Sequence, residues 1–316
     1  MEAALWRNFR HLRRVRKSLA PGQKLIAIVL IEHMGDILAC EPVARHVREM
    51  FPDDHVLWIV GEHYRKLVET HPALDGCLAV SCLTECLRLM EHPGIDRVIN
   101  LHVNLRRCTA FGTILHKQQG DTAITTENYF HYGSLLEAFC RSAGLPPLLD
   151  APRFYLPPSL HNRTLPVPQD RPFIVLHATS NEAAKDWPVE KWRSLIAMMP
   201  ASFPFQLVEV GLAAKIAPGH PSVLDLCGKL SLLELAEIIR RSSGFIGVDS
   251  GPAHFANAFE RPSVVLLGRY RIFDAYMPYT GYLRVHADPM VLKWPGSPAE
   301  IPVEEVRRRI GMVMQN

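Results

Sequence analysis

The residues best suited to binding a phosphorylated ligand lie where an apolar run ends and a helical pattern begins. They read Gly247-Val248-Asp249-Ser250-Gly251-Pro252-Ala253-His254. At such a turn, exposed amides and the positive end of a helix attract a diphosphate. The glycine allows close backbone approach, and the serine and histidine side chains can donate hydrogen bonds. In the alternative interpretation Asp249 and Ser250 only cap the helix while His254 packs, and the spacing favours neither.

A second polar loop, 178–188, precedes another helical pattern. It contains the hydroxyl groups of Thr179 and Ser180 and the ammonium group of Lys185. Lys185 could neutralise phosphate charge on a departing group, although lysines in loops are usually solvated and the signal alone is weak.

A third loop, Met34-Gly35-Asp36, follows the first apolar run. Asp36 could act as a general base, or it could be the N-cap of the helix that follows. From the residue type alone, the cap is the favoured interpretation.

The elements that must position these loops alternate between strands and helices. The apolar run 24–31 is rich in β-branched residues, which is typical of a strand buried on both faces of a parallel sheet. In the first half we expect strands at 24–31, 55–60, 77–81 and 97–101, and helices at 37–50, 62–70 and 128–143. In the second half we expect strands at 173–177, 205–210, 223–226, 244–248 and 263–267, and helices at 188–199, 231–241 and 252–259. This alternation predicts doubly wound α/β architecture, in which ligands bind beyond the carboxyl ends of the strands.

A chain of 316 residues that is 48% hydrophobic is too long for one ordinary core. Five prolines between 156 and 172 make that stretch the best linker candidate. We therefore expect a basic N-terminal segment and two Rossmann-like lobes with parallel sheets facing across a cleft. The predicted divisions are 1–23, 24–156, 157–172 and 173–316, the third being the linker.

The composition excludes several classes of protein. No apolar run is long enough to span a membrane, and residues 1–17 lack the apolar stretch of a signal peptide, so we expect a cytoplasmic protein. Seven scattered cysteines do not resemble a disulfide framework or a metal site, and reduced thiols are expected. Motifs of dinucleotide-binding enzymes, of phosphate-binding-loop nucleotidases and of zinc hydrolases are absent.

The net charge of +3 hides a basic N-terminal segment. Residues 1–17 contain six basic residues and one acidic residue. The remainder of the chain is nearly neutral, which gives no reason to expect nucleic acid as a partner. Apolar residues recur at helical spacing through residues 5–17. Such a helix could lie on the inner face of the cell membrane, bound to anionic lipid, or it could pack on the N-terminal lobe, and the pattern suits both.

At these three loops the sequence resembles glycosyltransferase family 9, the heptosyltransferases of lipopolysaccharide core synthesis. The resemblance runs from Leu25 to about Gly268, and its parts agree with the family in order and spacing. They are Ile28-Val29-Leu30-Ile31, Met34-Gly35-Asp36-Ile37-Leu38 with Pro42, Lys185-Asp186-Trp187-Pro188-Val189-Glu190-Lys191-Trp192, and the 247–254 stretch, which resembles an Asp-x-Gly-x-x-His signature.

The resemblance implies a GT-B fold and inverting transfer without a metal ion or a cofactor. The donor would be ADP-heptose or a similar nucleotide sugar, and the acceptor a hydroxyl of a lipopolysaccharide-core-type, lipid-linked or other glycan. Asp36 would be the base, with Gly35 beside it on the acceptor side. The donor would be held by Thr179, Ser180, Lys185, Asp249, Ser250, Gly251 and His254.

The sequence departs from the family pattern in two places. Family members often carry acidic residues that can meet the ribose after the strand ending Glu209-Val210-Gly211, whereas Leu212-Ala213-Ala214-Lys215 follows here. The segment 102–128 matches no known acceptor-binding pattern. Two other classes stay open: an epimerase would turn over a nucleotide sugar without acceptor, and a non-catalytic binding protein would release no nucleotide.

Overall fold

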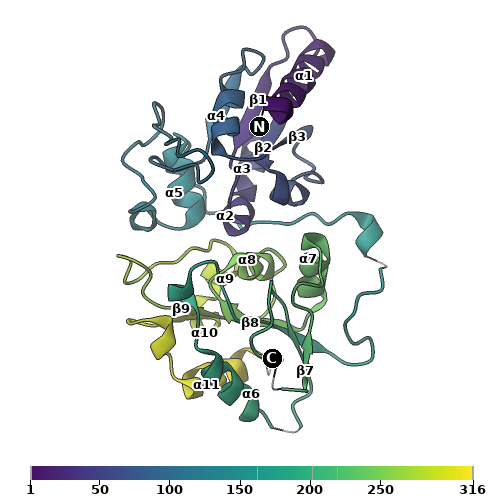
Figure 1. Ribbon diagram of the computed structural model, residues 1–316, viewed down its shortest axis with the longest axis vertical. Coiled ribbons are helices and arrows are strands. Elements are labelled where there is room, and N and C mark those ends of the chain that lie inside the picture. The colour runs from purple at the N-terminus through teal and green to yellow at the C-terminus, as the bar shows by residue number, and fades with distance from the viewer. Residues whose placement is uncertain (1, 162, 201, 219, 315–316) are drawn as a thin grey trace. The chain divides into compact units, whose positions relative to one another are not determined.

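The structure is a computed structural model that describes residues 2–161, 163–200, 202–218 and 220–314. The chain divides into two compact units, Met1–Tyr155 and Leu156–Asn316 (Figure 1). Each unit contains one parallel sheet with helices packed against it.

The sheet of the first unit has the strand order β3-β2-β1-β4, and all its pairs are parallel. Its strands are β1 (Leu25–Val29), β2 (His55–Gly61), β3 (Gly76–Val80) and β4 (Arg97–Asn100). Every residue of β1 is buried, as the continuous apolar run predicts for a central strand. The four strands predicted for this half are confirmed.

The helical elements of the first unit differ from the prediction in three places, one of which is a missed helix at 83–90. They are α1 (Glu2–Ser18), α2 (Met34–Ala39), α3 (Glu41–Met50), η1 (Glu62–Leu67), α4 (Leu83–Met90), η2 (Tyr129–Tyr132) and α5 (Leu135–Ser142). The helix expected over 37–50 is interrupted at Cys40. The helix expected over 128–143 is wrong in its first part, because Gly133 has a φ of 113° and Ser134 caps a new helix in a reciprocal pair with Glu137.

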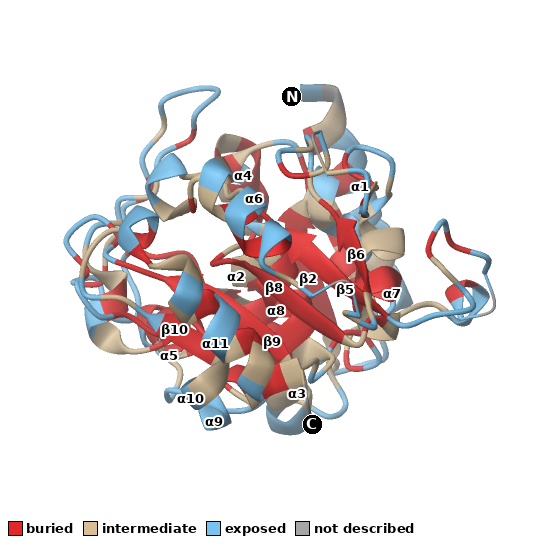
Figure 2. Cartoon of the chain, turned by 90° about the horizontal axis from the view of Figure 1, so that it is seen from below, coloured by how far each residue is buried: buried red, intermediate tan, exposed pale blue. Residues whose placement is uncertain are grey.

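The sheet of the second unit has the order β10-β9-β8-β5-β6-β7 and is parallel throughout. Its strands are β5 (Phe173–His177), β6 (Gln206–Glu209), β7 (Val223–Asp225), β8 (Gly244–Val248), β9 (Ser263–Leu267) and β10 (Val291–Lys293). The first five were predicted, and β10 was missed. Figure 2 shows β5, β8 and β9 as buried strands, which agrees with their apolar composition.

The helical elements of the second unit include three that the sequence predicted. The set is η3 (Pro158–Leu160), η4 (Ala183–Lys185), α6 (Val189–Ala197), α7 (Leu232–Arg241), α8 (Gly251–Ala258), α9 (Tyr282–Val285), α10 (Ala287–Met290), η5 (Pro298–Glu300) and α11 (Val303–Met314). The predicted capping box of α7 is present, since the Ser231 hydroxyl accepts from the Glu234 amide and the Glu234 carboxylate accepts from the Ser231 amide.

The N-terminal helix α1 packs on the first unit. This is the second of the two alternatives proposed for residues 5–17. Leu5 and Leu12 are buried in the core beside β1 and β3, and Asn8 donates hydrogen bonds to the Ala79 carbonyl and the Glu85 carboxylate. Among the described residues, no helix is long and apolar enough to cross a bilayer.

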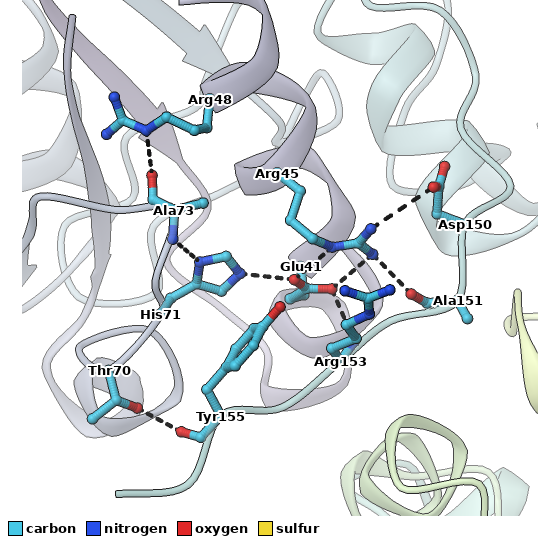
Figure 3. Close-up of polar contacts among 10 residues, drawn as sticks. All are labelled: Glu41, Arg45, Arg48, Thr70, His71, Ala73, Asp150, Ala151, Arg153 and Tyr155. Atoms are coloured by element: carbon cyan, nitrogen blue, oxygen red, sulfur yellow. Dashed lines mark hydrogen bonds and ion pairs between the residues drawn. The ribbon is translucent and has the colours of Figure 1, made fainter. Parts of the chain in front are cut away.

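A buried carboxylate holds the last segment of the first unit in place (Figure 3). Glu41 accepts hydrogen bonds from His71 at 2.7 Å, from Arg45 at 3.0 and 3.2 Å, and from the Arg153 amide at 2.8 Å. Arg45 also donates to the Ala151 carbonyl. Burial would raise the pKa of Glu41, but the hydrogen bonds from His71 and Arg45 and the charge of Arg45 outweigh it and lower that pKa.

Replacing this carboxylate should destabilise the first unit. We expect Glu41→Gln to lower the free energy of unfolding by about 3 kcal/mol near neutral pH, because it leaves Arg45 without its buried counter-ion. The folded-state pKa is depressed, so this contribution is present above the ordinary glutamate pKa of about 4.3 and is lost as pH falls through the folded value. The difference between variant and wild type should therefore shrink in acid, as measured by urea unfolding.

A matched control is Asp150→Asn. The carboxylate of Asp150 is half exposed and lies 3.8 Å from Arg45, so its loss should cost less than about 1 kcal/mol. Equal destabilisation by the two substitutions would contradict the role assigned to Glu41.

Candidate functional site

Two of the three predicted loops lie next to each other in the second unit. The loop 178–188 follows β5, the loop 249–254 follows β8, and these strands are hydrogen-bonded parallel neighbours. Their carboxyl ends therefore meet at the same edge of the sheet. The third loop follows β1 in the first unit.

Asp249 is the centre of the site in the second unit. It is 4% exposed, and its carboxylate accepts from Lys185 Nζ at 2.8 Å, from Tyr276 Oη at 3.0 Å and from Tyr279 Oη at 2.8 Å. Burial would raise the pKa of Asp249, but the charge of Lys185 and the hydrogen bonds it receives lower that pKa overall. Burial and the neighbouring carboxylate raise the pKa of Tyr279 well above its ordinary value. The site therefore contains an ionised carboxylate surrounded by donors.

Lys185 is held in a fixed position. Its side chain is only 15% exposed, and Nζ lies 4.3 Å from the centre of the Tyr270 ring in addition to its ion pair with Asp249. Behind it, the Trp187 side chain is buried and donates to the Ile301 carbonyl at 3.0 Å. The expectation that a lysine in this loop is solvated is wrong, because a carboxylate and an aromatic face on other segments enclose it.

No side chain caps the start of α8. Ser250 occupies the N-cap position, but its hydroxyl donates to the Val248 carbonyl at 3.1 Å, and Asp249 faces Lys185 and the tyrosines. The capping explanation of these two residues is therefore wrong. Gly251 begins the helix. Pro252 has no N–H and the Ala253 amide donates to the Ser250 carbonyl at 3.1 Å, so the Gly251 amide is the first-turn donor at this end of the helix.

The His254 side chain is packed in the interior, as the alternative interpretation of this loop expected. It is 3% exposed, and its ring centre lies 4.7 Å from that of Tyr279. Because it lies within the first turn of α8, it still borders the loop that contains Ser250 and Gly251.

Thr179 and Ser180 lie in the loop directly after β5, and both are half-buried. The Ser180 hydroxyl donates to the Glu182 carbonyl at 2.7 Å, and the Ser180 amide donates to Asp186 at 2.6 Å. These bonds close the loop on itself and hold Lys185 toward Asp249.

The segment between β9 and α9 contributes residues that sequence reasoning missed. Tyr270, Tyr276 and Tyr279 all come from it, and Asn257 of α8 anchors its end by donating to the Thr280 carbonyl. Its irregular spacing shows neither helical nor strand periodicity. The signal that could have found it is its place after β9, since the loop lies at the same carboxyl edge as the other two.

The turn after β6, where the family often has acidic residues, is organised around Glu209. This buried carboxylate accepts from the amides of Lys215 at 2.7 Å, Ile216 at 3.0 Å and Ala217 at 2.7 Å. Leu212 is 95% exposed at the tip of the turn. The Glu209 carboxylate is thus used for hydrogen bonds to the backbone of the loop.

Asp36 of the first unit lies in the first turn of α2 and is not its N-cap, a position that His33 occupies. The Asp36 carboxylate accepts from the His33 amide at 3.0 Å, and His33 Nδ1 lies 3.5 Å from it. Burial would raise the pKa of Asp36, but the hydrogen bonds from His33 and the positive charges of His33 and Arg106 lower it overall. Gly35 precedes Asp36 in the same turn.

Arg106 belongs to the long segment 102–128 that the sequence left unassigned. It pairs with Glu32 at 2.7 Å and lies 3.5 Å from His33 Nε2. Lys117 anchors this segment by donating to the carbonyls of Asn100 at 2.7 Å and of His102 at 2.8 Å. Burial lowers the pKa of Lys117 to about 7. The anchored segment thus places the guanidinium group of Arg106 near Asp36.

The described residues contain no group of three or more histidine, cysteine or acidic side chains arranged to hold a metal ion. All seven cysteines are free thiols. The positive groups of the second-unit site include Lys185 and the Gly251 amide at the start of α8.

Comparisons with known proteins agree on one family. Residues 132–273 match the model of glycosyltransferase family 9 (heptosyltransferase). Lipopolysaccharide heptosyltransferase 1 of Campylobacter coli is 21% identical over 286 residues, covering 77% of this chain and 83% of the relative.

Solved structures of low sequence identity share the fold. The E. coli ADP-heptose lps heptosyltransferase II superposes with a TM-score of 0.68 at 15% identity, covering 93% of this chain and 99% of that one. The E. coli heptosyltransferase WaaC with ADP gives a TM-score of 0.60 at 18% identity, covering 91% and 99%. The predicted GT-B class with two Rossmann-like lobes is confirmed. Together with these structures, the family match over residues 132–273 and the related sequences indicate a glycosyltransferase that resembles the heptosyltransferases of glycosyltransferase family 9.

Proposed function

We propose that this protein transfers a heptose from ADP-heptose to a hydroxyl group of a lipopolysaccharide-core-type or other glycan acceptor, with inversion at the anomeric carbon and without a metal ion. The observation that carries the proposal is the Lys185–Asp249 pair beside the start of α8, at the edge where β5 and β8 end. A buried cation next to the N-terminal end of a helix suits a nucleoside diphosphate. The names of the related proteins, which include ADP-heptose and ADP, support the choice of sugar and base.

In the proposed reaction the acceptor oxygen forms a bond to the anomeric carbon as the bond from that carbon to the diphosphate breaks. The acceptor proton passes to Asp36, and the electron pair of the broken bond leaves with ADP. Asp36 suits this role because its neighbours keep it ionised. Lys185 and the Gly251 amide at the start of α8 stabilise the negative charge that develops on the diphosphate.

Donor binding is shared among several groups in this proposal. Lys185, Ser250 and Gly251 contact the diphosphate, with Thr179 and Ser180 at its side and His254 next to it. Asp249 acts indirectly, because it fixes Lys185 and two tyrosine hydroxyls in one arrangement.

The reaction is tested by incubating the purified protein with ADP-heptose and EDTA, with and without a lipopolysaccharide acceptor, and measuring ADP release. We expect release that depends on acceptor and persists in EDTA. In Asp36→Asn we expect the rate to fall about a thousandfold while donor binding is retained, since an amide cannot take the proton.

Other outcomes distinguish the alternatives. Loss of activity in EDTA, restored by a divalent ion, would contradict the metal-independent mechanism. Epimerised donor without acceptor would indicate an epimerase, and donor binding without any turnover would indicate a binding protein.

The pH dependence of the reaction should report on His33. The hydrogen bonds and the charge of His33 lower the pKa of Asp36, so removal of this side chain should raise that pKa. We expect the acid limb of the kcat/KM profile to move to higher pH in His33→Asn. The exposed His286 of the second unit provides the control, and His286→Asn should leave the profile in place.

A pair of variants can separate the contact of Lys185 with the ligand from its ion pair with Asp249. Lys185→Met should weaken ADP binding about 10- to 100-fold, as measured by calorimetry, through loss of a charged hydrogen bond and exposure of the ligand to an uncompensated Asp249. The double variant Lys185→Met, Asp249→Asn removes that second effect. If the double variant binds ADP as the wild type does, Lys185 serves only to neutralise Asp249 and does not contact the diphosphate.

A further inference from the structure

Helix α1 has two faces of different character, and only one of them is used in the fold. Leu5, Asn8 and Leu12 are buried against the first unit, and Phe9 and Val15 pack at the edge of the same core. The apolar side of the helix is therefore already covered and is not available to enter a bilayer.

The opposite face consists of cations and one aromatic residue. Trp6 is 55% exposed, and its exposed neighbours on this face are Arg7, Arg10, Arg13, Arg14 and Lys17. These positions recur at three- and four-residue spacing, which places them along one side of the helix. Trp6, Arg7, Arg10 and Arg14 together line an open surface hollow of about 720 Å³.

The charges of this face are not balanced within the fold. The two ion pairs of α1 join Arg16 to Asp96 and Glu2 to Arg88. In the part of the chain that the structure describes, none of the five cations beside Trp6 pairs with an acidic side chain. The face therefore presents a row of uncompensated positive charge along about 15 Å of helix.

We propose that this face of α1 binds the surface of an anionic phospholipid bilayer, with the helix lying parallel to the membrane plane. Five cations on one side of a straight helix match a planar layer of negative headgroups, and exposed tryptophan is favoured at the membrane interface. Binding is peripheral and mainly electrostatic, since the apolar side of α1 stays in the core. It concerns α1 alone and does not depend on the proposed transfer reaction.

The test uses the full chain and vesicles of phosphatidylglycerol mixed with phosphatidylcholine. We expect the protein to sediment with these vesicles at low salt, to be released at high salt, and to ignore vesicles of phosphatidylcholine alone. The variant Arg7→Gln, Arg10→Gln, Arg14→Gln should bind about 100-fold more weakly, because each basic residue near an anionic surface contributes about fivefold to affinity.

Two controls separate this effect from total charge and from folding. Lys24→Gln, Arg284→Gln, Arg307→Gln removes the same number of exposed cations elsewhere and should bind as the wild type does. Both triple variants should melt at the wild-type temperature, since the replaced side chains are exposed. Deletion of α1 is unsuitable, because it would also remove Leu5 and Leu12 from the core.

Trp6 gives an independent readout. Trp58, Trp187 and Trp192 are buried and Trp294 of the second unit is partly buried in its core, so a blue shift of tryptophan emission on adding anionic vesicles should be lost in Trp6→Phe. Absence of binding at low salt, or full binding by the α1 triple variant, would overturn the proposal. If a short RNA binds through the same arginines while anionic vesicles do not, the face is a nucleic-acid surface and the membrane assignment is wrong.

Discussion

Parallel hydrogen bonding between β5 and β8 is the constraint on which the second-unit site depends. Parallel strands place their carboxyl ends at one edge, so the loops that leave them must run side by side. Lys185 and Asp249 are 64 positions apart in the sequence, yet this pairing brings their side chains to 2.8 Å. The tyrosine-containing segment after β9 reaches the same edge because β9 is the next strand in the sheet.

Two carboxylates are kept ionised in this protein by different surroundings. Asp249 is enclosed by a lysine and two phenolic hydroxyls, which suits a residue that fixes its neighbours in place. Asp36 is only partly buried and is held by one backbone amide and nearby cations. A base must remain accessible to the proton that it receives, and the more open surroundings of Asp36 are compatible with that task.

Other polar residues support these loops from behind. Glu209 organises the turn after β6 through three backbone amides, and Lys117 ties the long segment 102–128 to β4. Each is a buried ionisable group that makes several hydrogen bonds to main-chain groups. Such groups hold irregular segments in one conformation where no helix or strand is available to do so.

The sequence by itself determined the alternation of strands and helices, the parallel α/β class and the three loops. Apolar periodicity and turn residues act over a few neighbouring positions, so β1, β5, β8 and the capping box of α7 could be predicted from local patterns. The same locality explains the helix wrongly extended through Gly133, where a positive φ breaks a pattern that still looked helical.

Only the tertiary structure decided how the side chains of the site are used. It paired Lys185 with Asp249, added Tyr276 and Tyr279, and placed Asp36 within a helical turn rather than at its cap. It also placed the apolar side of α1 against the core of the first unit and left the basic side chains exposed. These outcomes depend on contacts between segments distant in sequence, and the balance of burial against charge that sets them exists only once the chain has folded.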